Sequence, residues 1–219
     1  SRGLGDVYKR QGVLYSEAAP TLGDFAAKHN IPIVETFAGK AAFSDSHPNY
    51  AGSLGIAGDA CSNAVAEDAD VVIAVGTKLQ DFTTGSWALF KDPNLKIVTI
   101  NTARWDATKQ HATSVMADAR VSIEQIDTAL GDYAAPADWL GRAQTEKQAW
   151  NAHLDECGQA VSSPPAYNQV IQRVHQVCDD SDYILSAAGG LPGELFAGWR
   201  AKDPHTFDCE FGYSCMGYE

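Results

Sequence analysis

"ADVVIAVG" (69–76) is the stretch that decides the fold of this chain. It is a continuous run of apolar, largely β-branched residues that closes at a glycine. Such a run is typical of a strand buried on both faces, which occurs mainly in parallel sheets covered by helices. Apolar runs at 31–35, 96–101 and 113–118 predict further strands of the same sheet.

Amphipathic stretches separate these strands. Residues 17–30, 58–68 and 119–130 place apolar side chains at helical spacing, and Asp59 is a candidate N-cap of the second helix. Strands that alternate with helices in this way predict an α/β fold with a doubly wound parallel sheet. Any crevice is then expected at the carboxyl ends of the strands.

The character of the sequence changes after residue 131. A polar helix is expected at 138–157, a helix with prolines in its first turn at 163–180, and a strand at 183–190 that runs into a glycine turn. A helix over 194–200 follows the turn. We divide the chain into residues 1–11, a central α/β domain at 12–131, an interdomain linker with a helix at 132–162, and an incomplete second α/β domain at 163–219.

The first eleven residues are left out of the prediction of the fold. "DVYKRQ" (6–11) resembles translated sequencing-adaptor read-through, so we predict that residues 1–11 are not native. The first strand of the sheet would fall in this region, and we therefore expect an incomplete sheet. We also expect the chain to be an internal fragment of a longer protein.

Charge and composition narrow the possible partners. The net charge is −12, with 28 acidic and 16 basic residues, which argues against nucleic acids and anionic membranes. The apolar runs are too short to span a bilayer, and no leader is recognisable, so we expect a cytoplasmic protein. Its five cysteines (61, 157, 178, 209 and 215) form no CxxC motif and are interpreted as reduced, mostly buried thiols.

One glycine-rich turn could carry chemistry. "SAAGGLPGE" (186–194) follows an expected strand and precedes an expected helix. Small residues there would let backbone N–H groups approach a phosphate. The stretch is neither a G-x-G-x-x-G nor a Walker motif, so a phosphate site and a purely structural turn remain equally open.

Other polar positions have a functional and a structural interpretation. The loop 74–87 could line a crevice, but a polar crossover loop that caps the next helix is favoured; the side chains concerned are Thr77, Lys78, Asp81 and Thr83. Asp106 could bind a nucleotide, although a turn residue is favoured. His47 and His111 could meet a substrate, but solvated loop histidines are favoured. Cys215 is interpreted as a packing residue rather than a nucleophile. No catalytic or metal-binding residue is assigned within the chain.

Three stretches together resemble one family. Residues 34–90, 186–200 and 210–219 are similar to the thiamine-diphosphate-dependent trihydroxycyclohexane-1,2-dione hydrolases of myo-inositol breakdown. The likeness extends over essentially all of residues 12–219 and is looser toward acetolactate synthase. It implies a subunit of three domains, of which 12–131 would be the central one and 160–219 the start of the diphosphate-binding one.

The resemblance also implies cofactors and binding residues. Thiamine diphosphate and Mg²⁺ are expected, in a site formed between subunits of a homodimer or homotetramer; FAD is not expected. The activating glutamate would lie N-terminal to this chain, and the Gly-Asp-Gly…Asn segment that holds Mg²⁺ would follow Glu219. Met216 would support the bent cofactor. The residues that match cofactor-binding positions are Ala188, Gly189 and Gly190 near the diphosphate, and Ser214, Cys215, Met216 and Gly217 near the aminopyrimidine. Acetolactate synthases carry polar side chains where this chain has Gly190 and Leu191, which leaves direct phosphate contacts open.

The implied reaction is hydrolytic opening of a cyclic 1,2-diketone, with 5-deoxy-glucuronate as product. The carbon–carbon bond between the two carbonyls would be cleaved. An acetolactate-synthase-like carboligase is the first alternative, and a module over 12–130 that binds NAD or FAD is the second. The fragment alone is expected to be inactive.

Overall fold

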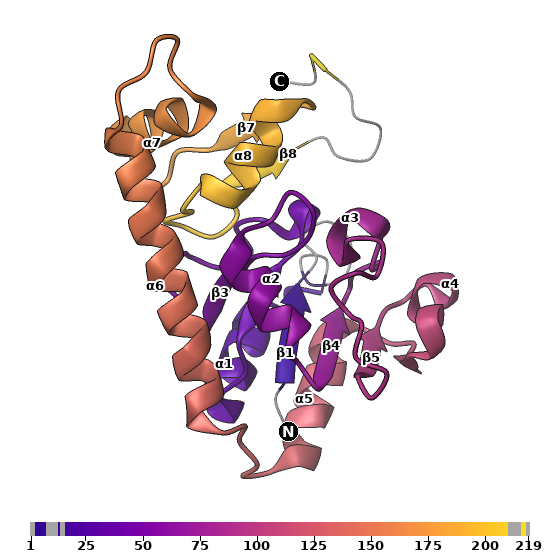
Figure 1. Cartoon of the computed structure of the whole chain (residues 1–219). Coiled ribbons are helices and arrows are strands. Elements are labelled where there is room, and N and C mark those ends of the chain that lie inside the picture. Colours follow the sequence, from indigo (N-terminus) through magenta and orange to yellow (C-terminus); the bar gives the residue numbers. More distant parts are fainter. Residues whose placement is uncertain (1–2, 8–12, 14–15, 210–215, 218–219) are drawn as a thin grey trace.

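A six-stranded parallel sheet forms the centre of the molecule (Figure 1). The computed structural model describes residues 3–7, 13, 16–209 and 216–217. The strand order is β3-β2-β1-β4-β5-β6, and every neighbouring pair is parallel. The strands are β1 (Gly3–Val7), β2 (Ile33–Glu35), β3 (Tyr50–Ser53), β4 (Val71–Val75), β5 (Lys96–Ile100) and β6 (Thr113–Val115). The expectation of a doubly wound α/β fold is confirmed.

Helices cover both faces of this sheet (Figure 1). α1 (Ala19–His29) and α5 (Ala119–Leu130) pack together over one face, while α2 (Ala60–Glu67) and α6 (Ala137–Gln159) pack over the other. Short helical segments lie in the loops: α3 (Asp81–Thr84), α4 (Arg104–Ala107), and the 3₁₀ turns η1 (Phe37–Gly39) and η2 (Lys109–His111).

The β-branched run in β4 explains why both faces are covered. Ile73 and Val75 contribute to the core beneath α1 and α5, whereas Val72 contributes to the core beneath α2 and α6. In β2, Ile33 contributes to the core beneath α1 and α5, and Val34 contributes to the core beneath α2 and α6. Because successive side chains of a strand point to opposite faces, a continuous apolar run needs helices on both sides.

Two strands differ from the expectations. Gly3–Val7 forms β1, which pairs with β2 and β4 at the centre of the sheet. Part of residues 1–11, which the sequence led us to exclude from the fold, therefore supplies a central strand. The non-native origin of residues 1–11 stays a prediction. β3 was not expected, because Tyr50–Ser53 contains no β-branched residue. It forms because all four residues are buried and pair with β2.

The N-cap of α2 agrees with the sequence. Asp59 is buried, and its carboxylate accepts hydrogen bonds from the backbone N–H groups of Ser62 (2.7 Å) and Ser53 (2.6 Å). The second bond connects the start of α2 to the end of β3. An added Cβ at Gly52 would lie 2.3 Å from an Asp59 oxygen, so only glycine fits beside this cap.

A smaller unit follows α6. It comprises α7 (Tyr167–Val177), β7 (Ile184–Ser186), α8 (Gly190–Gly198) and β8 (Phe207–Cys209), and β7 and β8 pair in parallel. The helix expected at 163–180 is shorter, because Pro164 and Pro165 lie before it and the Gln169 side chain caps the N–H of Ala166 (2.8 Å).

The turn after β7 also differs from the expectation. β7 stops at Ser186 rather than continuing to residue 190. The next helix begins at Gly190, earlier than the expected 194–200, because the glycines and Pro192 are accommodated in its first turn.

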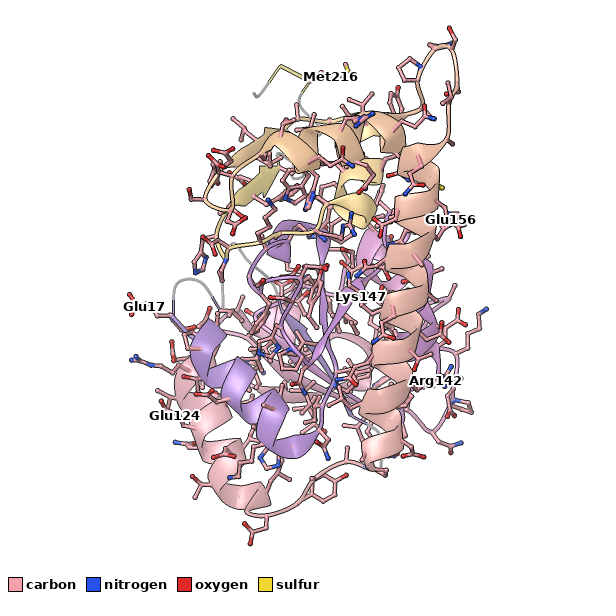
Figure 2. The ribbon with its side chains drawn as sticks, turned by 90° about the vertical axis from the view of Figure 1, so that its left-hand side faces the viewer. Glu17, Glu124, Arg142, Lys147, Glu156 and Met216 are labelled. Carbon is pink, nitrogen blue, oxygen red and sulfur yellow. The ribbon has the colours of Figure 1, made fainter. Side chains whose placement is uncertain are left out.

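α6 joins the two units and packs against both. It runs beside α2 and β3 and then beside α7 (Figure 1). Figure 2 shows Arg142 toward one end of α6 and Glu156 toward the other. Ala41 of the first unit shares a core with Leu195 and Trp199 of the second. The segment expected to be a linker is thus a packed helix, while the proposed domain boundaries remain predictions.

Within the described residues, the helices are too short or too polar to cross a membrane. The described cysteines are free: Cys61 and Cys209 are buried, and Cys157 and Cys178 are partly exposed. The expectation of mostly buried thiols therefore holds for two of these four, while Cys215 lies outside the described residues.

Replacing Asp59 by Ala should destabilise the protein by about 2–4 kcal/mol, because the helix loses its cap and the buried N–H of Ser53 loses its acceptor. The matched control is Asp118→Ala, which removes the N-cap of α5. This cap is exposed, so the control should cost only about 1 kcal/mol. Urea unfolding followed by circular dichroism measures both; equal losses would contradict the proposed connection between β3 and α2.

Candidate functional site

The turn between β7 and α8 has a backbone suited to binding an anion. Gly189 adopts φ 127° and ψ −166°, a conformation that L side chains rarely reach. It is the N-cap of α8, and no side chain caps this helix. The first backbone N–H groups of a helix have no intrahelical partner and lie at the positive end of its dipole. Ala188, Gly189 and Gly190 thus form a turn that could hold a diphosphate, and this role stays a prediction.

The second predicted segment is only partly described. Ser214 and Cys215 lie outside the described residues. Met216 and Gly217 lie in a turn, where the Met216 side chain is 83% exposed and Gly217 has φ 84°. An added Cβ at Gly189 or Gly217 would meet no described atom within 4 Å. The predicted grip on the aminopyrimidine stays a prediction.

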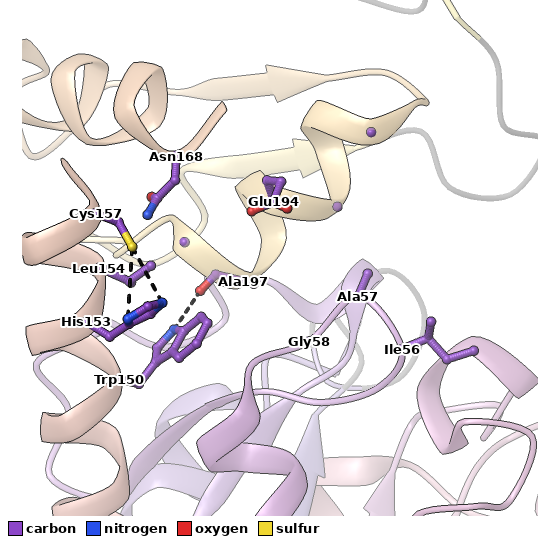
Figure 3. A pocket seen from close by; sticks show the side chains of 13 residues that line it. Ile56, Ala57, Gly58, Trp150, His153, Leu154, Cys157, Asn168, Glu194 and Ala197 are labelled. Atoms are coloured by element: carbon purple, nitrogen blue, oxygen red, sulfur yellow. Dashed lines mark hydrogen bonds between the residues drawn. The ribbon is translucent and has the colours of Figure 1, made fainter. Parts of the chain in front are cut away.

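A cavity of about 420 Å³ adjoins the same turn (Figure 3). We call it the α6–α8 cavity, because α6 and α8 provide most of its wall. The loop at 56–58 and the start of α7 complete it. Gly190 belongs both to the predicted diphosphate turn and to the lining of this cavity. The principal lining side chains are Trp150, His153, Cys157, Asn168 and Glu194.

A buried polar network lies beneath α8. We call it the Lys40 network, and its members are Glu35, Lys40, Tyr50 and Ser53. The ammonium of Lys40, only 2% exposed, donates to the Tyr50 hydroxyl (3.2 Å) and to the Ser53 hydroxyl (2.9 Å). The carboxylate of Glu35 accepts from the backbone N–H groups of Ala41 (3.1 Å) and Phe43 (3.0 Å).

Burial dominates the electrostatics of this network. It raises the pKa of Glu35, while the charge of Lys40 and the hydrogen bonds to the carboxylate oppose the change. It lowers the pKa of Lys40, against the attraction of Glu35. Burial and the neighbouring carboxylates raise the pKa of Tyr50 well above its usual value. Neither charge would be tolerated in this interior without the other.

The Lys40 network holds α8 against the sheet domain. The Ser53 hydroxyl donates to the backbone carbonyl of Phe196 in α8 (3.0 Å), and the Lys40 ammonium lies 5.7 Å from the centre of the Phe196 ring. Lys147 of α6 forms an ion pair with Asp45 at 2.6 Å. These contacts fix the helix whose first turn is the candidate anion site.

The sequence did not point to this network. Its available signal was a glutamate and a lysine in the otherwise apolar stretch "IPIVETFAGKAAF" (31–43). The sequence places Glu35 at the end of the strand expected at 31–35 and gives no sign that it meets Lys40. Only the packing of α8 over them shows that they are buried.

The crossover loop follows its structural interpretation. Thr77 and Thr83 are buried, and the backbone carbonyl of Lys78 accepts from the Lys109 ammonium (3.0 Å). Asp81 begins α3. Asp106 forms an ion pair with Lys109 at 3.0 Å. The carboxylate therefore has a partner within the chain, and its position needs no bound nucleotide to explain it.

The two loop histidines differ from each other. His111 is exposed, as favoured from the sequence. His47 is not a solvated loop residue: it is partly buried, its ring centre lies 5.2 Å from that of Phe43, and its Nδ1 accepts from the backbone N–H of Asn49 (3.2 Å). Burial lowers the pKa of His47 because the charged form loses solvation.

Metal-ligating side chains do not gather in the part of the chain that the structure describes. No group of three or more histidine, cysteine, aspartate or glutamate residues there could hold a metal ion.

Comparison with known proteins defines the class. A family model described as "Thiamine pyrophosphate enzyme, central domain" matches residues 8–126, a range that includes β2 to β6, α1 and α2. The chain belongs to the thiamine pyrophosphate enzyme family. The resemblance inferred from the sequence is thereby confirmed.

Its curated relatives are more specific. The chain is 40% identical to the 3D-(3,5/4)-trihydroxycyclohexane-1,2-dione hydrolase of Geobacillus thermodenitrificans, 35% identical to that of Clostridium perfringens, and 34% identical to that of Bacillus anthracis. Each match covers 95% of this chain and 36% of the relative. The chain thus spans about a third of the length of these relatives.

Replacing Lys40 by Met should destabilise the protein by about 3 kcal/mol, because the carboxylate of Glu35 loses its compensating buried charge. The double variant Glu35→Gln/Lys40→Met should lose less than the sum of the two single changes. Chemical unfolding of the four proteins measures this coupling. Additive losses would show that the two side chains are not a pair.

Lowering the pH from 7.5 to 5.5 should lower the melting temperature in part through His47. Its folded pKa lies below the unfolded value of about 6.5, so the unfolded state takes up the proton first and stability is lost as the pH falls through this range. His47→Phe should show a smaller decline, and the exposed control His111→Phe should decline like wild type. Differential scanning fluorimetry at each pH distinguishes them, and identical curves for all three proteins would refute the role of His47.

Proposed function

We propose that this chain is part of a thiamine-diphosphate-dependent hydrolase that opens the ring of trihydroxycyclohexane-1,2-dione to give 5-deoxy-glucuronate. The observation that supports this most is the uncapped glycine turn at Gly189, at the end of a parallel strand, in a member of the thiamine pyrophosphate enzyme family. The names of the relatives favour the hydrolase over a carboligase or a nucleotide-binding module.

The proposed cofactor site uses backbone rather than side chains. Ala188, Gly189 and Gly190 would offer N–H groups to the diphosphate, since no side chain makes a capping hydrogen bond at the start of α8. Residues 214–217 would contact the aminopyrimidine. Mg²⁺ would be held by ligands outside the described residues. When bound, thiamine diphosphate supplies the nucleophilic carbon needed to cleave a bond between two carbonyl groups.

The chain's own contribution to this chemistry is positioning. The Lys40 network fixes α8 through Ser53 and Phe196, and thereby fixes the orientation of the first-turn N–H groups. An anion site formed from a rigid backbone needs no rearrangement when the ligand arrives.

The overall reaction consumes one water. The bond between the two carbonyl carbons breaks; one of these carbons becomes a carboxylic acid and the other an aldehyde, within a single opened chain. We further propose that the whole protein is a cytoplasmic homo-oligomer, a dimer or a tetramer, whose cofactor sites form between subunits.

The test uses a chimera in which this chain replaces the matching third of the Geobacillus relative. We expect dione hydrolysis that requires thiamine diphosphate and Mg²⁺, and no condensation of pyruvate. Gly189→Ala should raise the thiamine diphosphate concentration for half-maximal activity about tenfold, because alanine is strained at this φ and the turn must shift.

Gly141→Ala in α6 is the matched control, since an added Cβ there meets no atom within 4 Å and its φ is not positive. It should behave like the unmodified chimera. Pyruvate condensation without dione hydrolysis would instead support the carboligase. Calorimetry of the 219-residue chain showing tight NAD binding, with no binding of thiamine diphosphate by the chimera, would support the nucleotide-binding module.

A further inference from the structure

The α6–α8 cavity has no permanently cationic side chain in its lining. None of its lining residues is a lysine or an arginine, whereas Glu194 brings a carboxylate to its wall. An anionic ligand would be repelled here, in contrast to the adjoining turn at the start of α8. The cavity and the turn therefore suit different kinds of molecule.

Two hydrogen-bonding groups in the lining are left for a ligand. The carboxylate of Glu194 has no hydrogen bond or ion pair to another described residue. The side-chain oxygen of Asn168 accepts from Gln172 (3.1 Å), while its NH₂ group has no described acceptor. One strong acceptor and one donor thus border the same cavity. His153 and Cys157 are turned toward each other, with Nε2 3.5 Å from Sγ (Figure 3).

An indole ring provides a fixed apolar part of the wall. The Nε1–H of Trp150 donates to the carbonyl of Ala197 (3.1 Å), and its ring lies 5.5 Å from that of His153 (Figure 3). The indole N–H is therefore already satisfied, and the ring is held in place.

Three of the five residues that α8 contributes to the cavity lining are glycines. Gly190, Gly193 and Gly198 all line the cavity, although glycine within a helix lowers its stability. At Gly193 the nearest atom to an added Cβ is the Cβ of Ala57, at 3.8 Å. An alanine would therefore fit at this position and would favour the helix. The glycine keeps volume open rather than avoiding a clash.

We propose that the α6–α8 cavity binds a neutral, polyhydroxylated six-membered ring. The C–H face of the ring would lie against Trp150, one hydroxyl would donate to Glu194, and another would accept from Asn168. The volume of about 420 Å³ lies in the range of small-molecule sites. That the natural ligand is the cyclic dione rests on the proposed function, and the shared residue Gly190 places such a ring beside the cofactor turn.

The experiment uses the 219-residue chain and myo-inositol as the probe. The indole N–H signal of Trp150, assigned by its loss in Trp150→Phe, should shift in ¹H–¹⁵N spectra with a dissociation constant on the order of 1 mM. Inositol hexakisphosphate, the anionic counterpart, should leave this signal unchanged.

Three variants locate the site. Glu194→Gln should weaken binding about fivefold to tenfold, because a hydrogen bond to a charged acceptor is lost. Glu156→Gln is the control, since Glu156 is exposed on α6 and does not line the cavity (Figure 2). Gly193→Leu should abolish binding by filling the cavity, while the helix signal in circular dichroism is retained.

The outcomes separate this inference from the proposed function. If myo-inositol gives no shift, or if Gly193→Leu is folded and binds normally, the cavity assignment is wrong, even where the chimera hydrolyses the dione. If the hexakisphosphate shifts Trp150 and myo-inositol does not, the neutral ligand class is wrong. If myo-inositol binds and the chimera has no thiamine-dependent activity, the cavity assignment stands and the proposed function fails.

Discussion

The buried ammonium group of Lys40 is the constraint on which the arrangement of this molecule depends. It lies where the sheet, the turn after β2 and α8 meet, and it is satisfied by the Tyr50 and Ser53 hydroxyls and by the nearby carboxylate of Glu35. A charge in such an interior is tolerated only when its partners stay in place. Any displacement of α8 would expose part of this network or leave it unsatisfied, so the network fixes the orientation of the two units.

This fixed contact bears on the proposed anion site at the start of α8, which uses backbone groups rather than reactive side chains. The first turn of α8 offers backbone N–H groups, and Gly193 leaves space where a side chain would otherwise project. Each glycine within a helix costs about 0.5–1 kcal/mol relative to alanine. The contacts beneath α8, through Phe196 and Trp199, offset that cost. The packed face of α8 thus stabilises the helix, while the face toward the α6–α8 cavity carries glycines.

The sequence was most informative where periodicity reflects burial. The run at 69–76 identified β4, the stretch at 119–130 gave α5 with the same bounds, and Asp59 was recognised as the cap of α2. It was least informative where tertiary contacts override local preference. β3 has no β-branched residue and forms because it completes the sheet beside β2. α8 begins at a glycine that a propensity argument assigns to a turn.

The sequence by itself determined the fold class, the family and the presence of a glycine turn after β7, because these follow from patterns within short stretches of chain. The tertiary structure decided which polar residues are buried and which face open space. Glu35 ends an expected strand with no partner indicated for its charge, and Glu194 and Asn168 fall within expected helices. Their roles depend on segments far away in the sequence, α8 for Glu35 and the rest of the Lys40 network, and α6 for the other two residues. The environment of a side chain is set by what packs against it, and no local pattern records that.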